Sequence, residues 1–302
     1  MALTAKVENR PAADSRPYYN DLTEQEQCTL MRQKFYKECR FYKDYGVDGM
    51  DMDCSPYAEA VRSEVIRILG QKGVDVVHGR LEQLHEHIPD DLKRYGFHDG
   101  VNQISTLLYD TDNAFMAQYH RMMKECVQKY FAYPFYFQAI PTIRIHCPGG
   151  ENNHHYPRYH TDINYGHPPE EINIWIPLTK PQAPQQHGFR MMSLKDSQHV
   201  LSEFDFAFKP FIEKAVHDKA FNAELNKVSP QVATPLGKML VFDSRCIHTA
   251  EPMQNHTRAS VDIRILPVED FRNSEVNYQG VGRRKIRYVP GEAYNSLIST
   301  EL

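Results

Sequence analysis

The sequence lacks any apolar run long enough for a membrane span, which needs about 20 consecutive apolar residues, and its first thirty residues contain no stretch typical of a signal peptide. It also lacks a strong charge excess: 35 basic and 39 acidic side chains give a formal net charge of −4, so charge offers no case for a nucleic-acid partner. The six cysteines form no Cys-x-x-Cys pair and no disulfide framework. We therefore expect free thiols in a cytoplasmic protein with no membrane partner.

The first half of the chain has helical patterns. Residues 1–20 are unpatterned and are expected to form a flexible N-terminus. Apolar residues then recur at helical spacing in four segments: a helix capped by Thr23, Pro56–Leu69 with Ser55 as its cap, Arg80–His87 and Asp112–Phe131. We predict that residues 21–134 form a helical layer packed on residues 135–302, within a single domain.

A possible metal site begins at His160-Thr161-Asp162. Among the 15 histidines, only His160 is followed two residues later by a carboxylate. In a strand these two side chains would share a face, with Thr161 turned away. His248, which ends a turn and strand running from Gly237, would complete two imidazoles and one carboxylate. Such a facial triad with open positions is typical of non-haem iron sites.

The strand predicted after His248 has one polar and one apolar face. The apolar face is Ala259, Val261, Ile263 and Ile265, and the polar face is Arg258, Ser260, Asp262 and Arg264. If the apolar face packs under helices, Arg258 and Ser260 point into the barrel near the metal. A buried arginine needs an anion. A dicarboxylate cosubstrate that reaches from the metal to Arg258 and Ser260 would supply one.

These residues resemble the Fe(II)/2-oxoglutarate-dependent oxygenases, which have a His-x-Asp pair, a distal histidine and a following Arg-x-Ser. The resemblance covers about residues 141–267. Tyr159–Asp162 followed by Glu171–Leu178 looks like the phytanoyl-hydroxylase-like branch, and more narrowly like oxygenases of the streptomycin-biosynthesis type. The gap between Asp162 and His248 is long for this family and implies a helical insertion around residues 200–230, which we expect to act as a lid.

The resemblance implies a mostly β chain: a double-stranded β-helix, also called a jelly roll or cupin-like barrel, under the N-terminal helices. It implies Fe(II) bound by His160, Asp162 and His248, with 2-oxoglutarate and O2 as cosubstrates. It also implies that 2-oxoglutarate meets Arg258 and Ser260. The expected reaction oxidises a C–H bond by hydroxylation, desaturation or ring closure, in specialised metabolism. Two other classes stay open, a metal-dependent isomerase or hydrolase without 2-oxoglutarate and a non-catalytic binding barrel.

Further residues are candidates for contacts in the site. The polar face of the strand Ala139–His146 is either a wet face of the sheet or the inside of the barrel, and in the second case Arg144 would contact cosubstrate or substrate. By the resemblance, Asn173 would donate a hydrogen bond to cosubstrate or to an iron-bound oxygen species. The remaining candidates are Trp175 as a cavity wall, Cys246 as a small filler, Arg190 for a substrate anion, the loop histidines His154 and His155, and the basic tail 280–287. Together they favour a small polar or anionic substrate.

Overall fold

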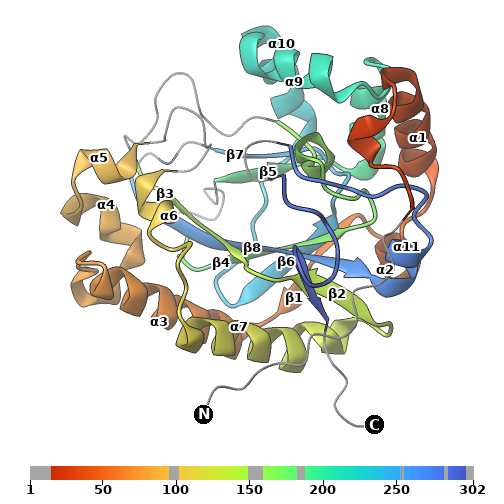
Figure 1. Ribbon diagram of the computed structural model, residues 1–302. Helices are drawn as coiled ribbons and strands as arrows, with labels where there is room; N and C mark the ends of the chain where they lie inside the picture. Colours follow the sequence, from red (N-terminus) through yellow and green to blue (C-terminus); the bar gives the residue numbers. More distant parts are fainter. Residues whose placement is uncertain are drawn as a thin grey trace.

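The computed structural model describes residues 15–94, 102–148, 159–181, 188–251, 253, 255–281 and 285–296. A large antiparallel sheet has the order β1-β6-β4-β8-β2-β9, with β3 pairing with β8 as well. A two-stranded sheet, β5-β7, lies above it in Figure 1. The strands are β1 (Gly49–Asp53), β2 (Phe135–Gln138), β3 (Thr142–His146), β4 (Ile172–Pro177), β5 (Phe189–Met191), β6 (Lys238–Asp243), β7 (His248–Ala250), β8 (Arg258–Pro267) and β9 (Tyr294–Ser296).

Helices surround the two sheets (Figure 1). They are α1 (Glu24–Tyr36), α2 (Arg40–Tyr45), α3 (Ser55–Gln71), α4 (Leu84–His87), α5 (Asp90–Lys93), α6 (Gln103–Thr106), α7 (Asn113–Glu125), α8 (Leu194–Ser202), α9 (Phe208–His217), α10 (Lys219–Val228) and α11 (Val268–Arg272). More of the described residues lie in helices than in strands, so the prediction of a mostly β chain is wrong. One reason is that residues 194–228 form three helices between two strands.

Helix α3 and helix α7 cover the lower face of the large sheet in Figure 1. Their buried side chains share one apolar core with the outward-facing residues of β3, β4, β6 and β8, which include Ile143, Ile174, Val241 and Ile263. Fully burying each such aliphatic side chain stabilises the fold by about 1.5–3 kcal/mol. This burial confirms that the apolar face of β8 packs under helices and that its polar face points to the other side.

Local sequence explains where the main helices begin. The Thr23 side chain accepts from the backbone N–H of Glu26, whose carboxylate accepts from the Thr23 N–H, a capping box that confirms the expected cap of α1. Asp112 caps α7 by accepting from the Phe115 N–H. The cap predicted for the next helix is one residue off, because Cys54 is the N-cap of α3 and Ser55 is already helical.

The N-terminal region also supplies a strand that the sequence pattern did not predict. Strand β1 pairs along its whole length with β6 at one edge of the large sheet. Its sequence, Gly-Met-Asp-Met-Asp, is poor in the β-branched and aromatic residues that favour strands, so tertiary pairing determines its conformation. The N-terminal region is thus joined to the large sheet by backbone hydrogen bonds as well as by packing.

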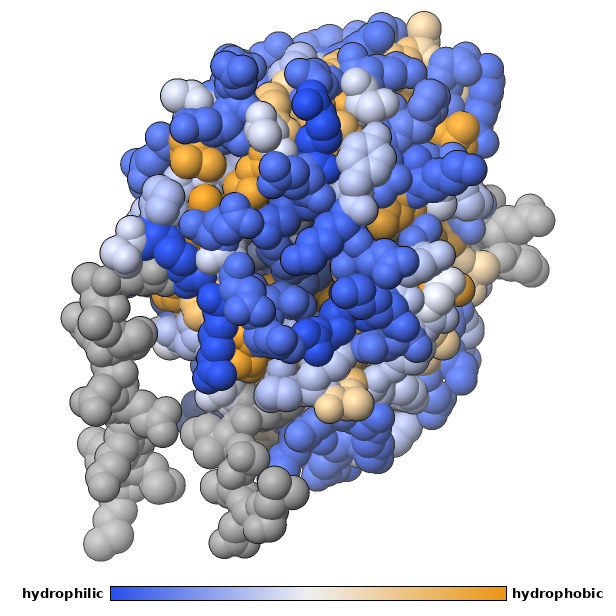
Figure 2. Space-filling model, turned by 90° about the vertical axis from the view of Figure 1, so that its right-hand side faces the viewer, coloured by the Kyte–Doolittle hydropathy of each residue, from blue (hydrophilic) through white to orange (hydrophobic). Residues whose placement is uncertain are grey.

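The face shown in Figure 2 is largely hydrophilic, with hydrophobic residues in small, scattered areas. Within the described ranges, no helix is both long and apolar enough to cross a membrane.

Candidate metal centre

Two backbone hydrogen bonds bring the candidate histidines together. The N–H of His160 donates to the carbonyl of His248 at 3.0 Å, and the N–H of His248 donates back to the carbonyl of His160 at 2.9 Å. This antiparallel bridge adds the His160 segment beside β7 and leaves the two imidazole rings 4.5 Å apart between centroids. The histidines are therefore held as a cross-strand pair on one face.

Asp162 lies at the start of a 3-10 turn, Asp162–Tyr165, and not in a strand, which corrects the expected local structure. The turn is fixed by Thr161, whose backbone N–H donates to the Asn164 side chain at 2.7 Å. Gly166 ends it in the left-handed region, with φ at +89°. Asp162 still reaches the histidines because the turn bends its carboxylate back toward them.

The ligand atoms of His160, Asp162 and His248 all lie within 4.8 Å of one another. His248 Nε2 is 3.9 Å from Asp162 Oδ1. Burial alone would raise the pKa of the Asp162 carboxyl, but the Arg264 guanidinium outweighs it and holds that pKa well below its usual range. The carboxylate is therefore ionised at neutral pH, as a metal ligand must be.

The ring of His248 is oriented for ligation through Nε2. Its Nδ1 lies 2.9 Å from the backbone carbonyl of Cys246, so Nδ1 carries the proton and Nε2 keeps its lone pair. Burial lowers the pKa of His248, which favours the neutral ring. Phe189 and Phe242 pack on this imidazole at 5.6 Å and 5.4 Å between ring centroids and screen it from water.

The inner face of β8 carries the second group of candidates. Cross-strand register places Ser260 opposite Arg144 on β3 and Arg258 opposite His146. Arg258 is 4% exposed, donates to the backbone carbonyl of Gly188, and has its guanidinium 6.0 Å from the ring of Trp175. The Ser260 hydroxyl is fully buried and has no hydrogen-bond partner among the described residues. A buried hydroxyl without a partner beside an arginine fits a bound carboxylate.

Arg144 also points to the inside, where its Nε donates to Asp262 Oδ2 at 2.6 Å. The pair is partly accessible, with 35% of the Arg144 side chain and 21% of the Asp262 side chain exposed. The other oxygen of Asp262 is buried and unpaired among the described residues. Of the two interpretations of this strand, the structure favours the one in which its polar side chains lie on the inner face of the large sheet.

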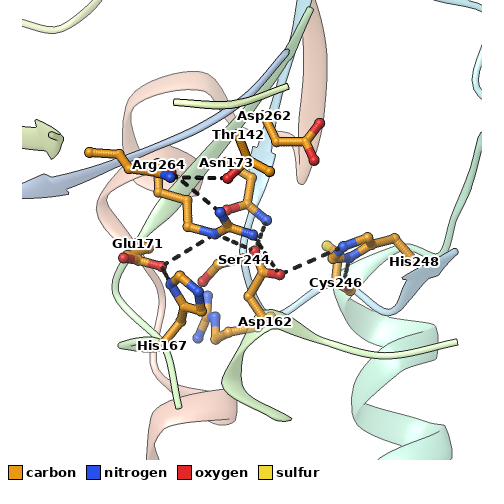
Figure 3. A network of polar contacts seen from close by, with 12 residues as sticks. Thr142, Asp162, His167, Glu171, Asn173, Ser244, Cys246, His248, Asp262 and Arg264 are labelled. Carbon is orange, nitrogen blue, oxygen red and sulfur yellow. Dashed lines mark hydrogen bonds and ion pairs between the residues drawn. The ribbon is translucent and has the colours of Figure 1, made fainter. Parts of the chain in front are cut away.

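Sequence reasoning missed a polar network behind Asp162 (Figure 3). Arg264 donates from Nε to Oδ2 at 2.9 Å and from Nη2 to Oδ1 at 3.0 Å, and Asn173 Nδ2 donates to Oδ2 at 2.7 Å. The carboxylate of Glu171 lies 3.9 Å beyond Arg264 and accepts from Tyr294. The alternation of β8 had placed Arg264 on the inner face, but spacing alone could not identify its partner.

The remaining candidates lie in packed or undescribed places. Arg190 pairs with Glu251 and donates to the carbonyls of Asn226 and Ser229, so it ties the end of α10 to β5 and has internal partners of its own. Trp175 is buried and stacks on Phe189, with the ring centroids 5.2 Å apart, and its role as a cavity wall stays a prediction. Cys246 is fully buried in the apolar core and, like the other cysteines, is a free thiol. His154, His155 and residues 282–284 of the tail lie outside the described residues.

The helical insertion directly contacts the segment that leads into His160 and Asp162. Tyr159, which precedes His160, bonds through its hydroxyl to Asn226 Oδ1 at 2.6 Å and to Ser229 Oγ at 2.5 Å. Helices α8, α9 and α10 lie above the β5-β7 sheet in Figure 1. These three helices lie between Asp162 and His248 in the sequence and account for the long spacing, while a lid movement stays a prediction.

Comparisons with known proteins find one partial sequence match and several solved structures of low sequence identity. No family model matches it. It is 32% identical over 84 residues to the streptomycin biosynthesis protein StrG of Streptomyces griseus, a match that covers 28% of this chain and only 35% of StrG. Among solved structures, HygX of Streptomyces hygroscopicus, with nickel and 2-oxoglutarate bound, is 13% identical with a TM-score of 0.45, covering 78% of this chain and 87% of HygX.

Two proteins of nogalamycin biosynthesis are also similar. The carbocyclase SnoK is 13% identical with a TM-score of 0.39, covering 88% of this chain and 89% of SnoK. The epimerase SnoN is 11% identical with a TM-score of 0.43, covering 90% and 99%. As its motifs predicted, the chain resembles non-haem 2-oxoglutarate-dependent enzymes of antibiotic biosynthesis.

Proposed function

We propose that the protein is a non-haem Fe(II)- and 2-oxoglutarate-dependent oxygenase with a double-stranded β-helix core. The two facing sheets, with the His160 segment beside β7, support this assignment of the core. The observation that carries the function is the joint presence of two sites on one inner surface. His160, Asp162 and His248 form a set that can hold a metal, and Arg258 with Ser260 forms a carboxylate site further along β8.

The charges around the triad support a dicarboxylate cosubstrate. The inner face carries the carboxylates Asp162 and Glu171, the guanidinium groups of Arg258 and Arg264, and the mutually neutralised pair Arg144–Asp262. These formal charges cancel, so a divalent metal alone would add two uncompensated positive charges to a buried site. A dianion that spans from the metal to Arg258 restores the balance.

Each residue then has a physical task. His160, Asp162 and His248 hold the metal, and Arg258 with Ser260 binds the far carboxylate of 2-oxoglutarate and so fixes its orientation. Bound there, Fe(II) and 2-oxoglutarate supply oxidation of a substrate C–H bond by O2, with release of succinate and CO2. Phe189, Phe242 and Trp175 exclude water from one side of the triad.

The substrate of this proposed enzyme is a small polar or anionic molecule of specialised metabolism. The partly exposed Arg144–Asp262 pair on the inner face supports a polar substrate, because an apolar one would remove water from both charged groups without offering them a hydrogen bond. The match to a streptomycin biosynthesis protein supports the metabolic setting. The Asn173 side chain donates a hydrogen bond to Asp162. We further propose that Asn173 contacts the cosubstrate.

A calorimetric titration distinguishes this proposal from a metal-dependent isomerase or hydrolase that has no 2-oxoglutarate site. Protein loaded with Mn(II) is titrated with 2-oxoglutarate and, separately, with pyruvate, which has the 2-oxo acid group but no far carboxylate. The proposal expects 2-oxoglutarate to bind at least ten times more tightly, since a charged hydrogen-bonded pair contributes about 1.5–3 kcal/mol. Equal or absent binding of both acids would contradict it.

A further inference from the structure

The guanidinium of Arg264 grips the carboxylate of Asp162 through both of its oxygens. Nε lies 2.9 Å from Oδ2 and Nη2 lies 3.0 Å from Oδ1, a side-on fork that fixes the plane of the carboxylate. Both side chains are sheltered, with 12% of Arg264 and 2% of Asp162 exposed. Because little water reaches this pair, its electrostatic attraction is screened less than that of an ion pair on the surface.

The two oxygens of Asp162 are not equivalent. Oδ2 accepts from Asn173 at 2.7 Å as well as from Arg264, so its hydrogen-bonding capacity is occupied. Oδ1 accepts only from Arg264 among the described residues, and it is the oxygen that lies 3.9 Å from His248 Nε2. The carboxylate is thus turned so that a single oxygen, Oδ1, faces His248.

Arg264 is itself held from behind. Glu171 is a fully buried carboxylate whose Oε2 lies 3.9 Å from Arg264 Nε, and it accepts hydrogen bonds from Tyr294 and from His167, the latter at 2.9 Å. Arg264 Nη1 also reaches Gln138 at 3.4 Å. Figure 3 shows Arg264 lying between the carboxylates of Asp162 and Glu171. These partners prevent the guanidinium from swinging away when the charge of the site changes.

We propose that Arg264 is a positioning residue for the metal centre, which keeps Asp162 turned so that one oxygen alone is offered to the metal. The inference rests on the proposed function, because it assumes that the triad binds a metal. A one-oxygen ligand leaves more coordination positions for cosubstrate and O2 than a carboxylate that chelates through both oxygens. Glu171 and Asn173 support this arrangement by holding Arg264 and Oδ2.

The test is the binding of Co(II), a visible-absorbing substitute for Fe(II), to the full-length protein. Affinity is measured by competition with a chromophoric chelator, and the ligand-field spectrum is recorded at saturation. Arg264→Met removes the fork, and we expect Co(II) to bind about 10–100-fold more weakly, the usual effect of losing a group that orients a metal ligand. We also expect an altered saturated spectrum, because the released carboxylate can turn and bind through both oxygens.

Two further variants serve as a control and as a test of charge against geometry. Arg67→Met is the matched control, since it removes an arginine that donates to both carboxylate oxygens of an aspartate outside the triad, Asp112 at the N-cap of α7. It should bind Co(II) like the wild type. Arg264→Lys keeps the charge without the fork, and it should resemble Arg264→Met. This variant decides the matter alone if circular dichroism shows that Arg264→Met does not fold.

The outcomes separate this inference from the proposed function. If the wild type binds Co(II) and Arg264→Met binds it equally well or more tightly with an unchanged spectrum, Arg264 does not position Asp162. If Arg264→Lys has wild-type affinity and spectrum, charge alone matters and the fork geometry does not. If the wild type itself fails to bind Co(II), the metal centre is wrong and the inference falls with it.

Discussion

Nε2 of His248 lies 3.9 Å from Oδ1 of Asp162, although the whole helical insertion separates the two residues in the sequence. The antiparallel bridge between His160 and His248 produces this approach, because it brings the two segments into register beside β7. The triad therefore depends on backbone pairing first and on side-chain orientation second.

Replacing any triad member should abolish metal binding. His160→Ala, Asp162→Ala and His248→Ala each remove one ligand, and the loss of one of three protein ligands should weaken Mn(II) or Co(II) binding by more than about 100-fold, beyond the effect of losing an outer-shell partner. His199→Ala is the control, since His199 lies on α8 with 79% of its side chain exposed. Metal binding retained by a triad variant, measured by calorimetry, would remove that residue from the site.

Arg258→Ala should spare the metal and weaken 2-oxoglutarate. Losing a charge-assisted pair of about 1.5–3 kcal/mol corresponds to a decrease in affinity of about 10–100-fold, while Ser260→Ala, which loses one neutral hydrogen bond, should cost less than tenfold. Calorimetry of the Mn(II)-loaded variants measures both effects. A decrease in metal affinity equal to that of a triad variant would show that Arg258 supports the fold of the site and does not contact the cosubstrate.

Gly166→Ala should destabilise the protein more than Gly46→Ala. Both glycines have positive φ, +89° and +68°, so each alanine incurs left-handed strain of about 1–2 kcal/mol. A Cβ at Gly166 would lie 2.1 Å from the backbone oxygen of Gln279, whereas nothing lies within 4 Å of one at Gly46. We expect about 1–3 kcal/mol of additional destabilisation at Gly166, measured by denaturant unfolding.

An equal effect of the two substitutions would contradict this close contact. The contact joins the turn that carries Asp162 to the segment that precedes β9. A hydrogen bond from the Val281 N–H to the Tyr165 carbonyl at 3.0 Å also joins these two segments. The C-terminal part of the chain therefore supports the turn that carries Asp162. Further along the same part of the chain, the Tyr294 hydroxyl donates a hydrogen bond to Glu171.

Glu82 should make stability depend on pH in the acidic range. Burial alone would raise the pKa of its carboxyl, but the Lys180 backbone N–H and Arg62 outweigh it and lower the pKa below the ordinary 4.5. A group with a depressed folded-state pKa stabilises the protein above its unfolded value, and this stabilisation is lost as the pH falls through the folded value. Glu82→Gln should therefore lower Tm at pH 7, and the difference from the wild type should shrink below about pH 4.5.

The control for this prediction is Glu213→Gln, which replaces an exposed side chain on α9. Its Tm should follow the wild type at every pH. A Tm difference for Glu82→Gln that stays constant from pH 7 to pH 3 would show that shape, and not ionisation, is what matters at this position.

Alternation and helical spacing predicted the parts of the fold that depend on burial. The apolar and polar faces of β8 were assigned correctly because residues two apart in a strand share a face and one face must be buried. The helices α1, α3 and α7 were found because amphipathic spacing and N-caps are local signals.

Long-range pairing explains what the sequence could not predict. The sequence of strand β1 has no local pattern typical of a strand, and β1 forms because its backbone pairs with β6. Asp162 reaches its site from a 3-10 turn that resembles a strand in sequence. Arg264 was placed on the correct face, but its choice of Asp162 over Asp262 depends on side-chain positions that alternation does not contain.

The most direct test of the central claim is an anaerobic titration of the purified protein with Fe(II) and then with 2-oxoglutarate, followed by visible absorption. Chelation of Fe(II) by a 2-oxo acid produces a weak metal-to-ligand charge-transfer band. The band should appear in the wild type on addition of 2-oxoglutarate, be absent in His248→Ala, and require higher 2-oxoglutarate concentrations in Arg258→Ala. Iron binding without any such band at saturating 2-oxoglutarate would contradict the proposed oxygenase and favour a metal-dependent isomerase or hydrolase.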